Sequence, residues 1–251
     1  FLRQTAKSNG IPLTHAALVL PSTGVFTREL VMPAMTEQQL LYNLPYEFRD
    51  YLTEEKSKYF FDYSMREVLQ DESGQPTEMN LLACATLKGT VESYRTMLRR
   101  AGFRLRVLTP SECAYSAVLQ AYYRRTQQEG HDLCVVNLGH SATFLYIYRG
   151  GHFASRREIE VGMSDLEHLV ADQCSVDIHV AHEYVRQNYN HVLESEQARE
   201  LYGRIAVEVV KAVNFFNYNN RERELTQLCL CGGGSAIQPL YDTIADTTGM
   251  T

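Results

Sequence analysis

The sequence predicts an α/β protein of two lobes, because strand-like and helix-like segments alternate in both halves of the chain. Short apolar runs bounded by Gly, Pro or polar residues recur as strand candidates. Helix-capping patterns open several of the segments between them. A long amphipathic helix is expected at about 194–219, where one face carries apolar residues at steps of three and four: Leu201, Ile205, Val209, Ala212 and Phe216.

The first half starts with two strand patterns, THAALVLP and GVFTRELVMP, joined by a turn at 22–24. Thr36 and Gln39 form a capping box, which predicts a helix that runs to about Leu52 and bends at Pro45. The next strand candidate is KYFFDYSMREVLQ, and the polar turn DESGQPTE follows it. MNLLACAT is continuously apolar, which is typical of a strand covered on both faces.

A helix at about 88–100 is expected to end at Gly102, and FRLRVLT then reads as a short strand. Thr109, Pro110 and Glu112 combine an N-cap, a proline at the first helical position and a capping acid. The helix they open should reach about Arg125. We therefore divide the chain into a first lobe at 1–110 and a second lobe at 111–251.

The second half opens with VVNLGHSATFLYIY, in which two strands flank a glycine turn, and a third strand follows through HFASRREIEVG. Ser164 and Glu167 resemble a capping box and predict a helix start. A shorter helix is expected at about 176–188. After the long helix come the strand LTQLCLC, the run Gly232–Gly234 and a helix from Ala236.

Composition limits the classes of function. With 45% apolar and 22% charged residues, the 251-residue chain is typical of a globular protein. A net charge of −6 argues against nucleic acid as the main partner. The most apolar run, at 16–20, is too short for direct insertion into a membrane. The six cysteines form no CxxC pair and are expected to be buried, reduced thiols.

Two glycine-rich turns are the main candidate sites, because strand–glycine–strand and strand–glycine–helix turns offer backbone N–H groups to phosphate. The second turn lacks a complete dinucleotide fingerprint, since Ile237 stands where its last small residue belongs, and the chain has no P-loop. A tight structural turn is the alternative interpretation.

His179 and His182 match no zinc spacing and are expected on a helix surface, where Glu183 and Arg186 could pair. Ser141 lacks a nucleophile elbow, so no catalytic residue and no metal ligand is assigned.

Taken in order, the glycine hairpin, Gly162, the ExxR helix and the strand–GGGS–helix turn resemble the second half of the actin-like (ribonuclease H-like) ATPase superfamily. The segment from LVLPSTGVF to RDYL, within about 14–57, looks like the inserted small α/β subdomain of the PilM family of type IV pilus assembly proteins. The segment from LLACAT to SECA is similar to the strand–helix–strand that follows it. FtsA, the actin-like division protein, is the nearest rival within the superfamily.

The resemblance implies a site for ATP with Mg²⁺. Its residues would be Gly139, His140, Ser141 and Thr143 at the phosphates, Gly162 below them, Glu183 and Arg186 near the adenosine, and Gly232, Gly233, Gly234 and Ser235 in the adenosine turn. Asn137 replaces the family's metal-directing Asp, and an amide binds a divalent cation more weakly than a carboxylate. The family's first phosphate hairpin is missing before Thr14. Weak or absent hydrolysis is therefore expected.

The same resemblance implies a cytoplasmic scaffold that docks the tail of a PilN-like inner-membrane protein and is recruited to the membrane through it. Aromatic residues of the first half, which suit peptide anchoring, are the candidates for this groove: Tyr42, Tyr46, Phe48 and Tyr51, with Phe60 and Phe61 near them in sequence. The alternative is that most of them are core residues. An ATP-hydrolysing enzyme of the same superfamily and a self-associating, FtsA-like filament protein remain the rival functions.

Overall fold

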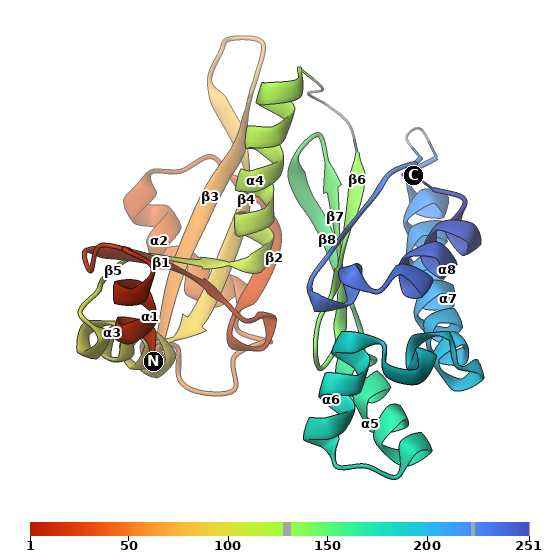
Figure 1. Cartoon of the computed structure of the whole chain (residues 1–251). Helices are drawn as coiled ribbons and strands as arrows, with labels where there is room; N and C mark the ends of the chain where they lie inside the picture. The colour runs from red at the N-terminus through yellow and green to blue at the C-terminus, as the bar shows by residue number, and fades with distance from the viewer. Residues whose placement is uncertain (128–131, 222–223, 251) are drawn as a thin grey trace. The chain divides into compact units, whose positions relative to one another are not determined.

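The computed structural model describes residues 1–127, 132–221 and 224–250 (Figure 1). Its contacts divide the chain into two compact units, Phe1–Val118 and Leu119–Thr251. The division falls inside helix α4 (Ser111–Thr126), a few residues beyond the boundary expected at 110. In the described ranges, no helix has both the length and the apolar composition that a bilayer crossing requires.

The first unit holds two small sheets. One is the parallel pair of β1 (His15–Leu20) and β5 (Arg104–Pro110). The other is antiparallel, in the order β2 (Phe26–Pro33), β4 (Pro76–Leu87) and β3 (Tyr59–Gln70). The remaining elements of this unit are α1 (Leu2–Ser8), η1 (Ser22–Gly24), α2 (Glu37–Glu47), η2 (Lys56–Lys58) and α3 (Lys88–Ala101). β1 and β2 are adjacent in sequence yet belong to different sheets.

The antiparallel sheet buries its core against α2. Leu81, Ala83 and Ala85 alternate along β4 and share a hydrophobic cluster with Leu40 and Leu44 of α2. Between them lie the buried Leu82 and the half-buried Cys84, so this central stretch of β4 is covered on both faces, as its apolar run predicted.

The capping box at Thr36 is present, because its hydroxyl accepts from the Gln39 N–H while the Gln39 side chain accepts from the Thr36 N–H. The expectation that this helix reaches Leu52 is wrong, since α2 ends at Glu47. Pro45 has no N–H for the helical ladder, and the helix ends two residues after it. Phe48 then turns into the core.

α3 ends as expected at Gly102, whose φ of 98° lies in the left-handed region that glycine adopts without strain. Pro110 is the last residue of β5, and α4 begins at Ser111. The proline therefore precedes this helix and does not occupy its first turn, which corrects the expected start by one residue.

The second unit is built on one four-stranded sheet in the order β8 (His152–Ile159), β7 (Thr143–Arg149), β6 (Leu133–Leu138) and β9 (Leu228–Cys231). β6 pairs in parallel with β9, and the other pairs are antiparallel. The other elements are α5 (Met163–Cys174), α6 (Ile178–Gln187), η3 (Tyr189–Glu194), α7 (Glu196–Asn219), η4 (Gly233–Ala236) and α8 (Gln238–Thr248).

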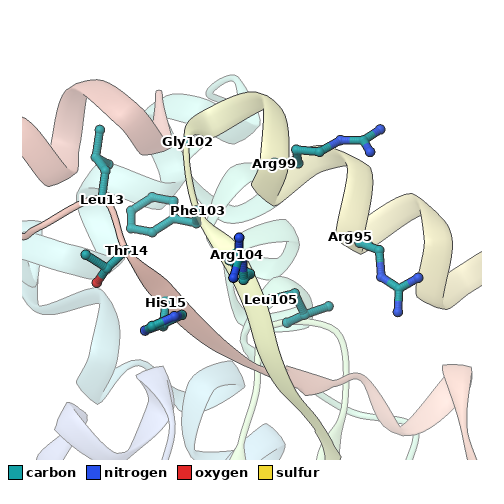
Figure 2. A pocket seen from close by; sticks show the side chains of 9 residues that line it. All are labelled: Leu13, Thr14, His15, Arg95, Arg99, Gly102, Phe103, Arg104 and Leu105. Carbon is teal, nitrogen blue, oxygen red and sulfur yellow. The ribbon is translucent and has the colours of Figure 1, made fainter.

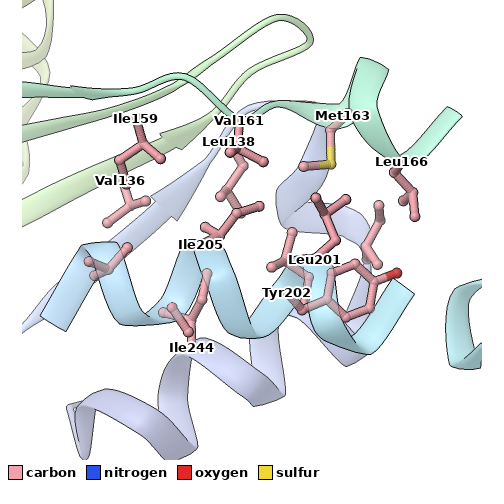
Figure 3. Close-up of a cluster of buried hydrophobic side chains, with 14 of the residues drawn as sticks. Val136, Leu138, Ile159, Val161, Met163, Leu166, Leu201, Tyr202, Ile205 and Ile244 are labelled. Atoms are coloured by element: carbon pink, nitrogen blue, oxygen red, sulfur yellow. The ribbon is translucent and has the colours of Figure 1, made fainter. Parts of the chain in front are cut away.

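The core of this unit lies between the sheet and α7, with α5 and α8 closing it (Figure 3). The five apolar positions expected on the long helix are all buried, which confirms the predicted face: Leu201, Ile205, Val209, Ala212 and Phe216. From the sheet, Val136 and Leu138 project into the same cluster. This packing holds the ends of β6 and β9, where both glycine turns begin.

Three local expectations are corrected in this unit. α5 starts at Met163, and its first turn is capped by the Asp165 carboxylate, which accepts from the Gly162 N–H at 2.8 Å. The last helix starts at Gln238 and not at Ala236, because the three glycines lead into a 3-10 turn first. Of the six thiols only Cys134 is buried, and Cys229 is exposed.

Candidate functional site

The two glycine turns lie against one another at one edge of the second unit's sheet. Asn137 is paired with Cys231 in the parallel β6–β9 register, so the turns that follow both strands leave at the same edge. A Cβ atom on Gly232 would lie 2.4 Å from Asn137 Oδ1 and 2.6 Å from the Leu138 carbonyl oxygen. Gly232 also has a φ of 85°. The position therefore admits only glycine without rearrangement.

Gly162 brings the start of α5 onto the first turn. A Cβ atom there would lie 2.3 Å from the His140 carbonyl oxygen and 2.6 Å from the Ala142 nitrogen. The first N–H groups of α5 donate into the same turn, Met163 to the Gly139 oxygen at 3.0 Å and Ser164 to the His140 oxygen at 2.7 Å. The turn, Gly162 and the helix start thus form one hydrogen-bonded block.

Part of the first turn remains open to a ligand. His140 and Ser141 are exposed, and in the described part of the chain their N–H groups donate to no backbone acceptor. Thr143 is different, because it is fully buried and its hydroxyl donates to the Val161 carbonyl at 2.9 Å. Its side chain therefore supports the turn from inside.

In the second turn, Gly233 is exposed with free space around it, whereas Gly234 is buried and closely packed. Gly233 is exposed and has no atom within 4 Å of the position of an added Cβ. Gly234 is buried, and a Cβ there would lie 2.7 Å from Met163 Sδ. The Ser235 hydroxyl donates back to the Gly232 carbonyl at 2.7 Å, which tightens the turn. Gly233 is therefore the point at which a bound group could approach the backbone.

This arrangement fits the backbone part of a nucleotide site better than its metal part. Glycines at close approaches and exposed N–H groups are the features with which such turns hold phosphate. The side chain at the end of β6 is the amide of Asn137, whose oxygen faces Gly232. Within the described ranges no three His, Cys, Asp or Glu side chains gather into a metal-binding group.

A buried carboxylate beside the first turn was missed by the sequence analysis. Glu167 is only 7% exposed, and its Oε1 lies 2.8 Å from His182 Nδ1 and 3.9 Å from His140 Nδ1. The predicted Ser164–Glu167 capping box is replaced by the Gly162–Asp165 contact, whereas His182 lies on the helix surface as predicted, with a side chain that is 56% exposed. The contact joins α5 to α6 beside the first glycine turn.

Glu183 and Arg186 form the surface pair that their spacing predicts. Arg186 Nη2 and Nε lie 2.7 and 3.0 Å from Glu183 Oε2. The hydrogen bond from Arg186 holds the pKa of the Glu183 carboxyl below its usual value. Among the described residues, their side-chain hydrogen bonds involve only each other and Gln187, so the pair is not joined to the glycine turns.

The aromatic candidates of the first unit separate into surface and core. Tyr42 is 70% exposed and Tyr46 51%, and their ring centroids lie 6.1 Å apart on α2. Lys56 Nζ lies 4.1 Å from the centre of the Tyr46 ring. Tyr51 is 46% exposed, whereas Phe48 is fully buried against Phe61. Phe48 therefore belongs to the core and cannot anchor a partner, which corrects its place among the groove residues.

Comparison with known proteins agrees with this architecture. The family model described as type IV pilus assembly protein PilM matches residues 1–251. A search among curated proteins found no match. A solved structure titled as a PilM–PilN type IV pilus biogenesis complex superposes with a TM-score of 0.79 at 19% identity, over 99% of this chain and 72% of that one. The ethanolamine utilization protein EutJ from Carboxydothermus hydrogenoformans has a TM-score of 0.51 at 16% identity, over 66% and 55%. An archaeal actin homolog is more distant, with a TM-score of 0.43 at 14% identity, over 58% and 49%.

Proposed function

The chain belongs to the PilM family of type IV pilus assembly proteins and has its actin-like α/β fold, and from this premise we propose that it is a scaffold for a membrane partner. The scaffold would lie in the cytoplasm, bind the tail of a PilN-like inner-membrane protein and reach the membrane through it. The observation that supports the proposal most is the match of the family model to the whole chain. The structurally similar PilM was solved together with PilN.

We further propose that the tail binds at a tyrosine surface, defined here as Tyr42, Tyr46 and Tyr51. These side chains are large, exposed and anchored on one small α/β subdomain. Tyrosine is frequent among residues that dominate binding energy, because its ring buries a large area while its hydroxyl can still donate. Binding through such anchors should depend only weakly on salt.

Calorimetry with the N-terminal tail of the PilN-like protein of the same organism tests this proposal. Tyr46→Ala should weaken binding by roughly thirtyfold, the equivalent of about 2 kcal/mol for a dominant contact. Tyr241→Ala is the matched control, because Tyr241 lies in the other unit and is similarly exposed at 46%. Absence of binding by the folded chain would end the scaffold proposal. If the two variants weaken binding equally, the tail remains the partner, but the tyrosine surface is not where it binds.

The glycine turns support a second role, the binding of a nucleotide without efficient hydrolysis. Phosphoryl transfer depends on metal and positioned charge, and Asn137 supplies no carboxylate at the end of β6. Sustained Mg²⁺-dependent phosphate release that Asn137→Ala abolishes would contradict this proposal. Sedimentation with and without nucleotide would reveal self-association.

A further inference from the structure

The first unit contains a groove that neither the glycine turns nor the tyrosine surface explains. Its volume is about 610 Å³. The basic groove, as we call it, is lined by Leu13, Thr14, His15, Arg95, Arg99, Gly102, Phe103, Arg104 and Leu105. Figure 2 shows Arg95 and Arg99 on α3, and Arg104 and Leu105 on the neighbouring strand β5.

The charge of this groove is positive and largely uncompensated. No acidic residue lines it. Arg95 is paired with Glu92, outside the lining, at 2.6 Å. In the ranges that the structure describes, Arg99 and Arg104 take part in no ion pair, and both are exposed. Two unpaired guanidinium groups on facing elements are therefore available to carboxylates, which they can bind through two hydrogen bonds each.

The floor of the groove is apolar. Leu13, Phe103 and Leu105 are each partly buried, and Leu13 lies close to Gly102, where an added Cβ would be 3.4 Å from Leu13 Cδ1. A ligand that fits both features carries negative charge next to an apolar group. A single phosphate would leave the floor empty, and the volume is that of a site for a larger ligand. A flat lipid surface would contact the exposed arginines more readily than the partly buried apolar side chains.

We propose that the basic groove binds an extended, acidic segment of a partner protein, with an apolar side chain of that segment on the floor. The groove shares no residue with the tyrosine surface, so the chain could hold two partner segments at once. The two sites also differ in kind, because binding here is driven by charge and weakens as salt screens it.

Fluorescence anisotropy with a short fluorescein-labelled peptide, in which aspartate and glutamate alternate with leucine, tests the proposal. Arg99→Glu combined with Arg104→Glu should weaken binding by roughly tenfold or more, since two attractive contacts with the carboxylates of the peptide become repulsive. Arg100→Glu combined with Arg106→Glu is the matched control, because it makes the same charge change on α3 and β5 outside the groove. Circular dichroism of each variant verifies that it is folded.

Binding that the double variant loses, that the control retains and that falls with salt supports the proposal. Failure of the intact chain to bind the peptide overturns it, as does an equal loss in the control. Phosphatidylglycerol vesicles form the second arm. Vesicle binding that depends on Arg99 and Arg104, without peptide binding, would assign the arginines to the membrane and reject the peptide. Loss of tail binding by Tyr46→Ala bears only on the tyrosine surface, so the two proposals fail separately.

Discussion

Replacing Gly162 by alanine is the sharpest test of the block formed by the first glycine turn and α5. The backbone of Gly162 has φ −137° and ψ −172°, which any residue adopts, so the added methyl group introduces no conformational strain of its own. Its cost is steric. The new Cβ would lie 2.3 Å from the His140 oxygen and 2.6 Å from the Ala142 nitrogen, and both are backbone atoms that cannot rotate away.

The magnitude follows from the contacts that must open. Forcing a methyl group into a packed site costs about 1–3 kcal/mol. Moving the turn away also breaks the bonds from Met163 N–H to Gly139 and from Ser164 N–H to His140, each worth about 1 kcal/mol. We therefore expect Gly162→Ala to lower the free energy of unfolding by about 3–5 kcal/mol.

Urea unfolding followed by far-ultraviolet circular dichroism measures this difference, because the chain has no tryptophan for fluorescence. Gly203→Ala is the control. Gly203 lies inside α7 with no atom within 4 Å of an added Cβ, so alanine there should stabilise the helix by about 0.5–1 kcal/mol. If Gly162→Ala is as stable as the original protein within about 0.5 kcal/mol, the close contact between the turn and α5 does not exist.

Three further outcomes are expected. Gly233→Val should leave the free energy of unfolding unchanged, because a Cβ at this position has free space. The same variant should abolish binding of a fluorescent ADP analogue, and unchanged binding would show that Gly233 is not part of the site. Phe48→Ala should cost about 3–5 kcal/mol of stability in a urea titration, whereas Tyr42→Ala should cost almost none, and similar losses would contradict their assignment to core and surface. Burial raises the pKa of the Cys134 thiol to about 12, so at pH 8 a thiol reagent should label the exposed Cys229 and spare Cys134 until the protein unfolds. Above the ordinary pKa of a thiol, Cys134 is ionised in the unfolded state but remains protonated in the folded state. Its contribution to the free energy of unfolding is therefore full below that ordinary pKa and declines as the pH rises toward 12.

Elements were easier to predict from sequence than their pairing. Apolar runs and turn residues located the strands because both signals are local, and the buried face of α7 followed from its periodicity. Which strands pair depends on the faces that are buried between distant segments. The sequence therefore did not indicate that β1 joins β5 and leaves β2, its neighbour along the chain, to β4.

In the candidate site, too, local features could be predicted from the sequence and contacts between distant segments could not. Both glycine turns could be predicted because glycine marks close approaches, and the structure brings them together at one sheet edge. The contact between Glu167 and His182 could not be predicted, because it joins two helices and carries no spacing signal. At the start of α5 the Gly162 N–H donates to the Asp165 carboxylate, and this contact stands in place of the predicted Ser164–Glu167 capping box. This leaves Glu167 free to turn inward.

The bonds from Met163 and Ser164 into the first turn have a mechanical consequence. The turn cannot shift alone, because its carbonyls are tied to the axis of α5, and α5 is tied through Glu167 and His182 to α6. A ligand that displaces the turn must therefore either break these links or drag both helices with it.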